Sequence, residues 1–187
     1  VSAAQTIALD AAYQRGLKRT DKNPRCHVVY SAGILDDYLS KFAERENISI
    51  SPECIHEAGL AVARTVYRVS MERGFKSRVL VGGRDPHHFT EFVGGDLAIT
   101  ISDYTVRDIL ANDPQVVSRI DVKTPAKILA ELEKKFPDFR PACEPDGLTP
   151  EEFRDFGPCV SFQNDCEQGY AQTLSEIENR RAAIERM

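Results

Sequence analysis

The sequence lacks any apolar run long enough to cross a bilayer, and it contains no tryptophan and only two methionines. A membrane-spanning helix needs about 20 consecutive apolar residues, so we do not expect an integral membrane protein. The first residues also lack the basic and then apolar pattern of a secretory signal. We therefore expect a cytoplasmic protein. Because the chain begins with Val1 and not with methionine, we also expect further sequence upstream.

Clustered positive charge is missing as well. The 187 residues carry a formal net charge of -5, and the pI of the sequence is about 5.4. Two short basic runs, Lys134-Lys135 and Arg180-Arg181, lie beside glutamates on expected helices, which is typical of solvated faces. Neutralising phosphates along a nucleic acid requires a concentrated Lys/Arg surface. We therefore do not expect a nucleic-acid-binding protein.

Cysteine is present, but without the spacings typical of disulfide frameworks and zinc sites. The five cysteines are an odd number and include no Cys-x-x-Cys pair, so we expect reduced thiols. The more specific alternative to reduced thiols without a ligand is a metal site built from Cys54, His56, His87 and His88. Cys54 and His56, two residues apart at the start of an expected helix, lie on different faces of that helix. We therefore expect no metal site and no cofactor.

Short apolar runs alternate with segments of helical periodicity along most of the chain. Residues 26–30, 78–81 and 97–101 predict strands, and the last two runs are apolar on both faces, as buried parallel strands are. Strands separated by helices indicate right-handed crossovers and a parallel α/β sheet. A sheet of only three such strands has exposed apolar edges. We expect such a sheet to be incomplete by itself.

Apolar periodicity and capping residues place the helices. We expect helices over residues 1–16, 34–38, 55–74, 102–112 and 124–132, short helical pieces at 89–92 and 149–153, and a last helix from about Asn164 to the end. Residues 137–147 are rich in proline and predict a connection. Asp36 and Asp37 are expected to stabilise a helix start. The apolar stripe of the last helix predicts a docking surface.

Five segments follow one another in an order shared with a known family. They are Val1-Ser-Ala-Ala-Gln5, Ile34-Leu-Asp-Asp-Tyr38, Arg73-Gly-Phe-Lys-Ser-Arg-Val-Leu80, Gly94-Gly95-Asp96 with Ile99-Thr-Ile-Ser102, and Leu148-Thr-Pro-Glu-Glu-Phe153. In this order they resemble the FSxxQA, G-R-I-x-D-W-Y, h-g-y-x-T-x-V-M, A-G-C-D-x-L-T-I-S and I-T-E-x-E-F segments of the transaldolase family. The resemblance spans the whole chain, which corresponds to about the last half or more of a transaldolase.

The resemblance implies the C-terminal part of a TIM (β/α)8 barrel. Residues 1–122 would form the barrel from helix five to helix eight, and residues 123–187 a helical tail packed on it. A TIM barrel holds its active site at the carboxyl ends of its strands. The implied activity is aldol transfer or cleavage of sugar phosphates through a lysine Schiff base, as in the pentose phosphate pathway. That lysine lies on strand four, so we expect no catalytic residue in this chain and no activity of this segment alone.

The resemblance also implies substrate-binding residues after the strands. Tyr30 and Ser31 end the implied strand six, and Tyr30 lies where the fructose-6-phosphate aldolase branch has a tyrosine, whose hydroxyl can transfer a proton. Gly83 and Arg84 follow the implied strand seven, with Gly83 in place of a serine and the arginine one position early. Gly33 replaces the family's phosphate-binding arginine. Contacts with substrate are therefore expected from Tyr30, Ser31, Gly83 and Arg84.

The loop Gly82–His88 allows two interpretations. Its exposed amides and Arg84 suit an anion, and a histidine there suits acid–base chemistry. Alternatively, Asp85 caps a helix that begins with Pro86. We expect both interpretations to hold for the backbone, and we do not expect the two histidines to be catalytic.

Three functions stay open at the level of the sequence. The first is a transaldolase-like enzyme, whose expected partners are a sugar phosphate, the missing N-terminal half of the barrel as the same or a separate polypeptide, and a second copy in a homodimer. The second is a non-catalytic or repurposed relative, a binding or assembly protein with an eroded phosphate site. The third is a metal-dependent enzyme that uses the histidine pair.

Overall fold

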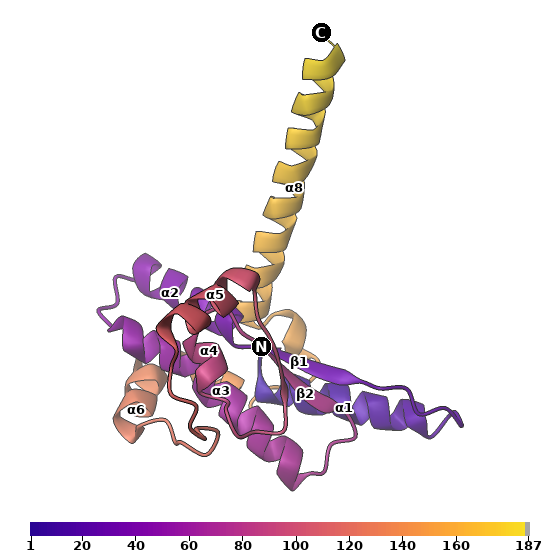
Figure 1. Ribbon diagram of the computed structural model, residues 1–187, viewed down its shortest axis with the longest axis vertical. Helices are drawn as coiled ribbons and strands as arrows, with labels where there is room; N and C mark the ends of the chain where they lie inside the picture. Colours follow the sequence, from indigo (N-terminus) through magenta and orange to yellow (C-terminus); the bar gives the residue numbers. More distant parts are fainter. Residues whose placement is uncertain (186–187) are drawn as a thin grey trace.

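The computed structural model describes residues 1–185 and shows a small parallel sheet with helices around it (Figure 1). Strand β1 is His27–Ser31, β2 is Arg78–Gly82 and β3 is Ala98–Thr100. The spatial order is β1-β2-β3, with His27 beside Arg78 and Leu80 beside Ala98. The parallel α/β sheet expected from the alternating pattern is therefore confirmed.

The helices follow the expected order. They are α1 Ala3–Leu17, α2 Ala32–Arg45, α3 Pro52–Glu72, α4 His87–Thr90, α5 Asp103–Asn112, α6 Ala126–Lys135, α7 Phe139–Cys143 and α8 Gly157–Glu185, with a 3₁₀ turn at Glu152–Arg154. Helix α2 extends seven residues beyond its expected end at Tyr38, and α7 and α8 also differ from the sequence predictions. Helix α7 lies inside the expected connection, because the burial of Phe139 and Ala142 favours a helical turn there. Helix α8 begins seven residues earlier than expected, at Gly157.

Serine side chains begin three of these helices. Ser2 forms a capping box with Gln5, and Ser51 and Ser102 each accept a hydrogen bond from a backbone N–H three residues later. Such caps satisfy N–H groups that have no partner within the helix and contribute about 1 kcal/mol each. The starts of α1, α3 and α5 are therefore determined locally by the sequence.

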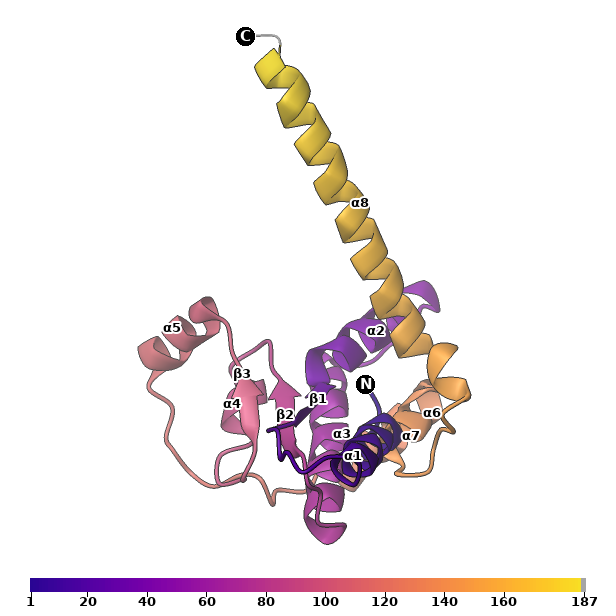
Figure 2. The same ribbon diagram turned by 90° about the vertical axis from the view of Figure 1, so that its right-hand side faces the viewer.

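The sheet is covered by helices on one face. Val28, Tyr30 and Val81 are buried among apolar side chains, and α1 and α3 contact both β1 and each other on that side. Figure 2 shows these two helices beside the sheet. On the opposite face of β1, the side chain of Val29 is 51% exposed. Since neighbouring residues of a strand point to opposite faces, one face of the sheet forms the core and the other lies open.

Helices α2 and α3 cross at very close range because α3 has a glycine at the contact. The Gly59 N–H donates to the Asp36 carboxylate at 2.8 Å. A Cβ atom at Gly59 would lie 2.6 Å from the Ala32 carbonyl oxygen and 2.8 Å from the Asp36 carboxylate. No side chain fits at this crossing, so the position of Asp36 depends on Gly59.

The C-terminal helices differ in how they pack. Helices α6 and α7 lie against α3 and bury Leu132, Phe136 and Phe139. Helix α8 contacts α2 near its start, where Lys41 pairs with Asp165, and then projects away from the rest of the molecule (Figure 1). Its apolar stripe is therefore exposed over most of its length. The exposed members are Tyr170, Leu174, Ile177 and Ile184. Among residues 1–185, no helix is both long and apolar enough to cross a membrane.

We expect Gly59→Ala and Gly169→Ala to have opposite effects, although both replace a helical glycine. Overpacking at Gly59 should lower the free energy of unfolding by about 1–3 kcal/mol. Gly169 lies on α8 with nothing within 4 Å of an added Cβ, so alanine there should stabilise the helix by up to about 1 kcal/mol. Urea denaturation followed by circular dichroism measures both effects. Equal destabilisation by the two variants would contradict the close helix crossing.

Candidate functional site

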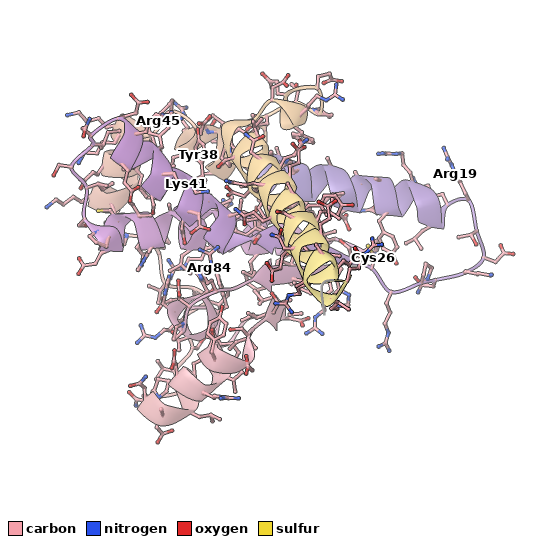
Figure 3. All side chains as sticks on the ribbon, turned by 90° about the horizontal axis from the view of Figure 1, so that it is seen from above. Arg19, Cys26, Tyr38, Lys41, Arg45 and Arg84 are labelled. Carbon is pink, nitrogen blue, oxygen red and sulfur yellow. The ribbon has the colours of Figure 1, made fainter. Side chains whose placement is uncertain are left out.

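An arginine–aspartate pair lies at the carboxyl edge of the sheet. Arg84 follows β2, and both terminal nitrogens of its guanidinium pair with the two carboxylate oxygens of Asp37 from the first turns of α2. Figure 3 shows Arg84 between α2 and the part of the chain that carries α5. The hydrogen bonds and charge of Asp37 raise the pKa of Arg84, whose charge is therefore permanent. The side chains are 49% and 42% exposed, so an anion in solution can compete with Asp37.

The backbone of Arg84 is held from two sides. Its N–H donates to Nδ1 of His88 at 3.3 Å, and its carbonyl oxygen accepts a hydrogen bond from the Thr105 hydroxyl at 2.7 Å. Thr105 lies in the first turn of α5, where its hydroxyl also contacts that of Ser102 at 2.8 Å. The start of the loop after β2 is therefore fixed by α4 and α5, and only the end of the arginine side chain is free to change partner.

A buried aspartate–histidine pair anchors this arrangement. His88 is 1% exposed, and its Nε2 lies 2.9 Å from Oδ2 of Asp36, whose other carboxylate oxygen accepts the Gly59 N–H. Since Nδ1 of His88 accepts the N–H of Arg84, Nε2 carries the ring proton and donates it to Asp36. Burial raises the pKa of Asp36, and the hydrogen bonds from His88 and Gly59 oppose that rise. A hydrogen-bonded chain thus connects α3, α2 and α4 to Arg84.

Three histidine rings lie in contact beside this pair. The His87 ring is stacked on His56, with centroids 4.7 Å apart, and lies 4.1 Å from the ring of His88. Burial, and then the neighbouring rings of His88 and His56, lower the pKa of His87 to about 4. His87 is therefore neutral at pH 7. Its Nε2 is buried and has no hydrogen-bond partner among the described residues.

Asp36, His87 and His88 are the described residues that come nearest to a metal site, with one donor atom of each within 4.8 Å of the others. One feature opposes metal binding. Nε2 of His88 carries a proton, as its neighbours require, whereas a metal needs an unprotonated nitrogen. Cys54 is bonded elsewhere, to Glu131.

The structure brings some of the expected substrate-binding residues together. Ser31 lies next to Gly82 at the end of β1 and β2, and the Gly83 N–H donates to Thr100 of β3. The Arg84 side chain lies over Gly33, 3.5 Å from the position of an added Cβ. The guanidinium of Arg84 therefore occupies space beside the position where the resemblance implies another arginine.

Tyr30 lies apart from this edge group. Its side chain is completely buried on the helix-covered face of the sheet, and its hydroxyl has no hydrogen-bond partner among residues 1–185. Burial, with smaller effects from Asp36 and Cys143, raises the pKa of Tyr30 well above its usual value. A proton-transfer role would need a route from this hydroxyl to a substrate. The role of Tyr30 stays a prediction from the resemblance.

The pairs that hold the site together are not evident from the sequence. Asp36 and Asp37 are expected there to stabilise a helix start, whereas in the structure they pair with His88 and Arg84. The available signal was that carboxylates follow one parallel strand and cationic or histidine side chains follow the next, which places them at the same edge. No protein-family model matches this chain, and no curated protein matches it.

We expect His87 to make stability depend on pH. Its pKa is about 4 in the folded protein, below the ordinary value of 6.5, so its contribution is present above pH 6.5 and is lost as the pH falls towards 4. For this half-buried ring the loss should be about 1–2 kcal/mol after allowance for solvent screening. The measurement is the thermal midpoint from pH 7 to 4.5 for the wild type and His87→Gln.

The control for this experiment is His27→Gln, which removes an exposed histidine at the start of β1. It should retain the acid-induced loss that His87→Gln reduces. The raised pKa of Asp36 has the opposite sign, because its contribution is lost as the pH rises. The difference between wild type and variant therefore isolates His87. Identical pH profiles for all three proteins would contradict the neutral, buried state of its ring.

Proposed function

We propose that this chain is the C-terminal part of a transaldolase-like enzyme that transfers or cleaves the aldol unit of a sugar phosphate. The observation that carries this proposal is the position of Arg84, a permanent cation at the carboxyl edge of parallel strands whose spatial order follows the chain. Parallel α/β folds bind ligands at that edge. The order of the resembling segments supplies the reaction class.

The open face of the sheet supports a barrel in which further strands complete the sheet and this face lines the interior. Parallel strands in sequential order, with α1 and α3 on the same side, are also the arrangement expected of one part of a (β/α) barrel. The exposed Val29 would then face the barrel interior. None of the three described strands contains a lysine. The Schiff-base lysine of this proposal therefore lies in sequence outside these 187 residues.

Arg84 is the residue of this chain that binds the substrate phosphate in this proposal. The phosphate displaces the Asp37 carboxylate from the guanidinium, while His88 and Thr105 keep the backbone in place. Bidentate pairing suits both carboxylate and phosphate oxygens. The lysine amine condenses with the substrate ketone with loss of water, and the resulting iminium accepts the electron pair of the breaking C–C bond. This chain contributes orientation to that step.

A second candidate is a binding or assembly protein that retains the barrel without catalysis. Two observations favour it: Asp37 already pairs with both terminal nitrogens of Arg84, and Gly33 lies where the resembling family has its phosphate-binding arginine. An arginine held by an internal carboxylate can be purely structural. The two candidates differ in whether a sugar phosphate binds, and in whether a covalent adduct forms.

Borohydride trapping tests the enzyme directly. The protein that carries the upstream half, in one chain or as a complex, is incubated with fructose 6-phosphate or dihydroxyacetone and reduced. We expect a stable adduct on a lysine upstream of this segment, detected by mass spectrometry, because reduction converts the Schiff base into an amine. The 187-residue chain alone should give none. Absence of an adduct in the full-length protein would rule out the Schiff-base enzyme.

Ligand-induced stabilisation tests the phosphate contact. We expect fructose 6-phosphate to raise the thermal midpoint of the full-length protein in a concentration-dependent way, and Arg84→Met to abolish the shift. Asp37→Asn should strengthen binding by about threefold to tenfold, since the internal competitor loses its charge. The control is Asp103→Asn, which releases Arg107 from a more exposed arginine–aspartate pair on α5. No shift with the wild type would favour the non-catalytic relative.

A further inference from the structure

A cavity lies beside α3, and Arg84 is not among the residues that line it. It is a cleft of 870 Å³ between α3, residues 120–126 and α6. Its wall is mainly apolar and includes the side chains of Tyr67, Met71, Ile120, Val122 and Leu129. Small-molecule sites commonly have volumes of about 300–1,000 Å³, an apolar lining and a few polar groups that fix the ligand. The cleft has the size and the lining of such a site.

One polar group in the wall has a free donor. The side chain of Arg64 is only 10% exposed. One terminal nitrogen donates to Glu57 and Thr124, and the other donates to Glu91 at 2.7 Å. Its Nε is buried without a hydrogen-bond partner among the described residues. Buried N–H groups in folded proteins almost always have an acceptor, and Arg64 is part of the cleft wall, so a ligand in the cleft that reaches Nε would supply the acceptor that this donor lacks.

The charges around Arg64 determine the kind of acceptor. Glu57 and Glu91 neutralise its guanidinium, and the second charge of this carboxylate pair is offset by Arg119, 3.4 Å from Glu91. An anionic ligand head would therefore meet two carboxylates next to a cation that is already paired. A neutral carbonyl oxygen can accept from Nε without that repulsion. The other charged residues of the wall balance as well, because Arg68 pairs with Glu72, and Asp121 and Lys123 carry opposite charges. The local electrostatics thus favour a neutral ligand.

We propose that this cleft binds a neutral, largely apolar small molecule whose carbonyl oxygen accepts a hydrogen bond from Nε of Arg64. The apolar body lies along Met71, Val122 and Leu129, where it removes exposed apolar surface from water. Arg84 does not line the cleft, so this site is independent of the proposed sugar-phosphate site. Either proposal can fail without the other.

The probe for this site is Prodan, a neutral naphthalene with a single ketone, whose emission brightens and shifts to the blue when it leaves water. We expect titration with the full chain to give saturable binding at one site. Decanamide, which is neutral, should displace the probe at a concentration about fivefold or more below that needed for decanoate, which carries a carboxylate. No saturable binding, or stronger displacement by decanoate, would overturn the proposal.

A matched pair of tryptophan variants locates the binding. Val122→Trp places a large ring at the mouth of the cleft, where Val122 is 47% exposed, so the protein should fold and lose at least tenfold in probe affinity. Val116→Trp makes the same change at a side chain that is 84% exposed and does not line the cleft. It should bind the probe like the wild type. Equal effects of the two variants would place the probe elsewhere and overturn the proposal.

Arg64→Lys tests the hydrogen bond. Lysine retains a positive charge for the two glutamates but has no donor at the position of Nε, so probe affinity should fall by about fivefold. Circular dichroism and the thermal midpoint establish whether the variant is folded. If Arg64→Lys does not fold, the preference for decanamide over decanoate in the wild type decides whether the site binds a neutral ligand as proposed. A folded variant with unchanged affinity would overturn the assignment of Arg64.

Discussion

The carboxylate of Asp36 is the group on which the rest of the site depends. It accepts hydrogen bonds from Gly59 of α3 and from the buried His88 of α4. Helices α2, α3 and α4 therefore meet at this one side chain. An unpartnered carboxylate at this depth would be very unfavourable, and loss of either donor would leave it only half satisfied. The close crossing of α2 and α3 follows from this constraint, since only glycine allows the backbone N–H to reach the carboxylate.

Much of the fold was predictable because its determinants are local. The apolar runs predict β1, β2 and β3, and Ser102 caps α5 where the sequence indicates, while α3 begins three residues earlier than expected, after Ser51. Helix α7 was missed because its proline-rich composition is typical of a connection, while the burial of Phe139 against α3 depends on tertiary packing. The direction of α8 is likewise not local. A helix satisfies its own backbone hydrogen bonds, so its amphipathic pattern does not specify what its apolar stripe packs against.

The candidate site was predictable only in part for the same reason. Arg84 was expected at the sheet edge because it follows a strand, and that expectation needs only the strand and its direction. The partners of Arg84 could not be read from the chain. Asp37 and Thr105 lie 47 and 21 residues away from it, and His88 reaches Arg84 only because α4 turns back over the loop. Distances of this kind are set by the packing of α2, α4 and α5, for which the sequence carries no short-range signal.

Asp36 and Asp37 are neighbours on α2, but one has a buried structural role and the other forms an exposed ion pair. Consecutive residues of a helix point about 100° apart, so one carboxylate faces the core while the next faces solvent. Asp36 has fixed partners and is buried, and therefore it cannot exchange them without unfolding its surroundings. Asp37 pairs with Arg84 in water, where such a pair contributes only about 0–1 kcal/mol, and a phosphate can replace it at little cost. In the proposed phosphate site, the buried pair would hold the backbone of Arg84 in place while the end of its side chain exchanges partners.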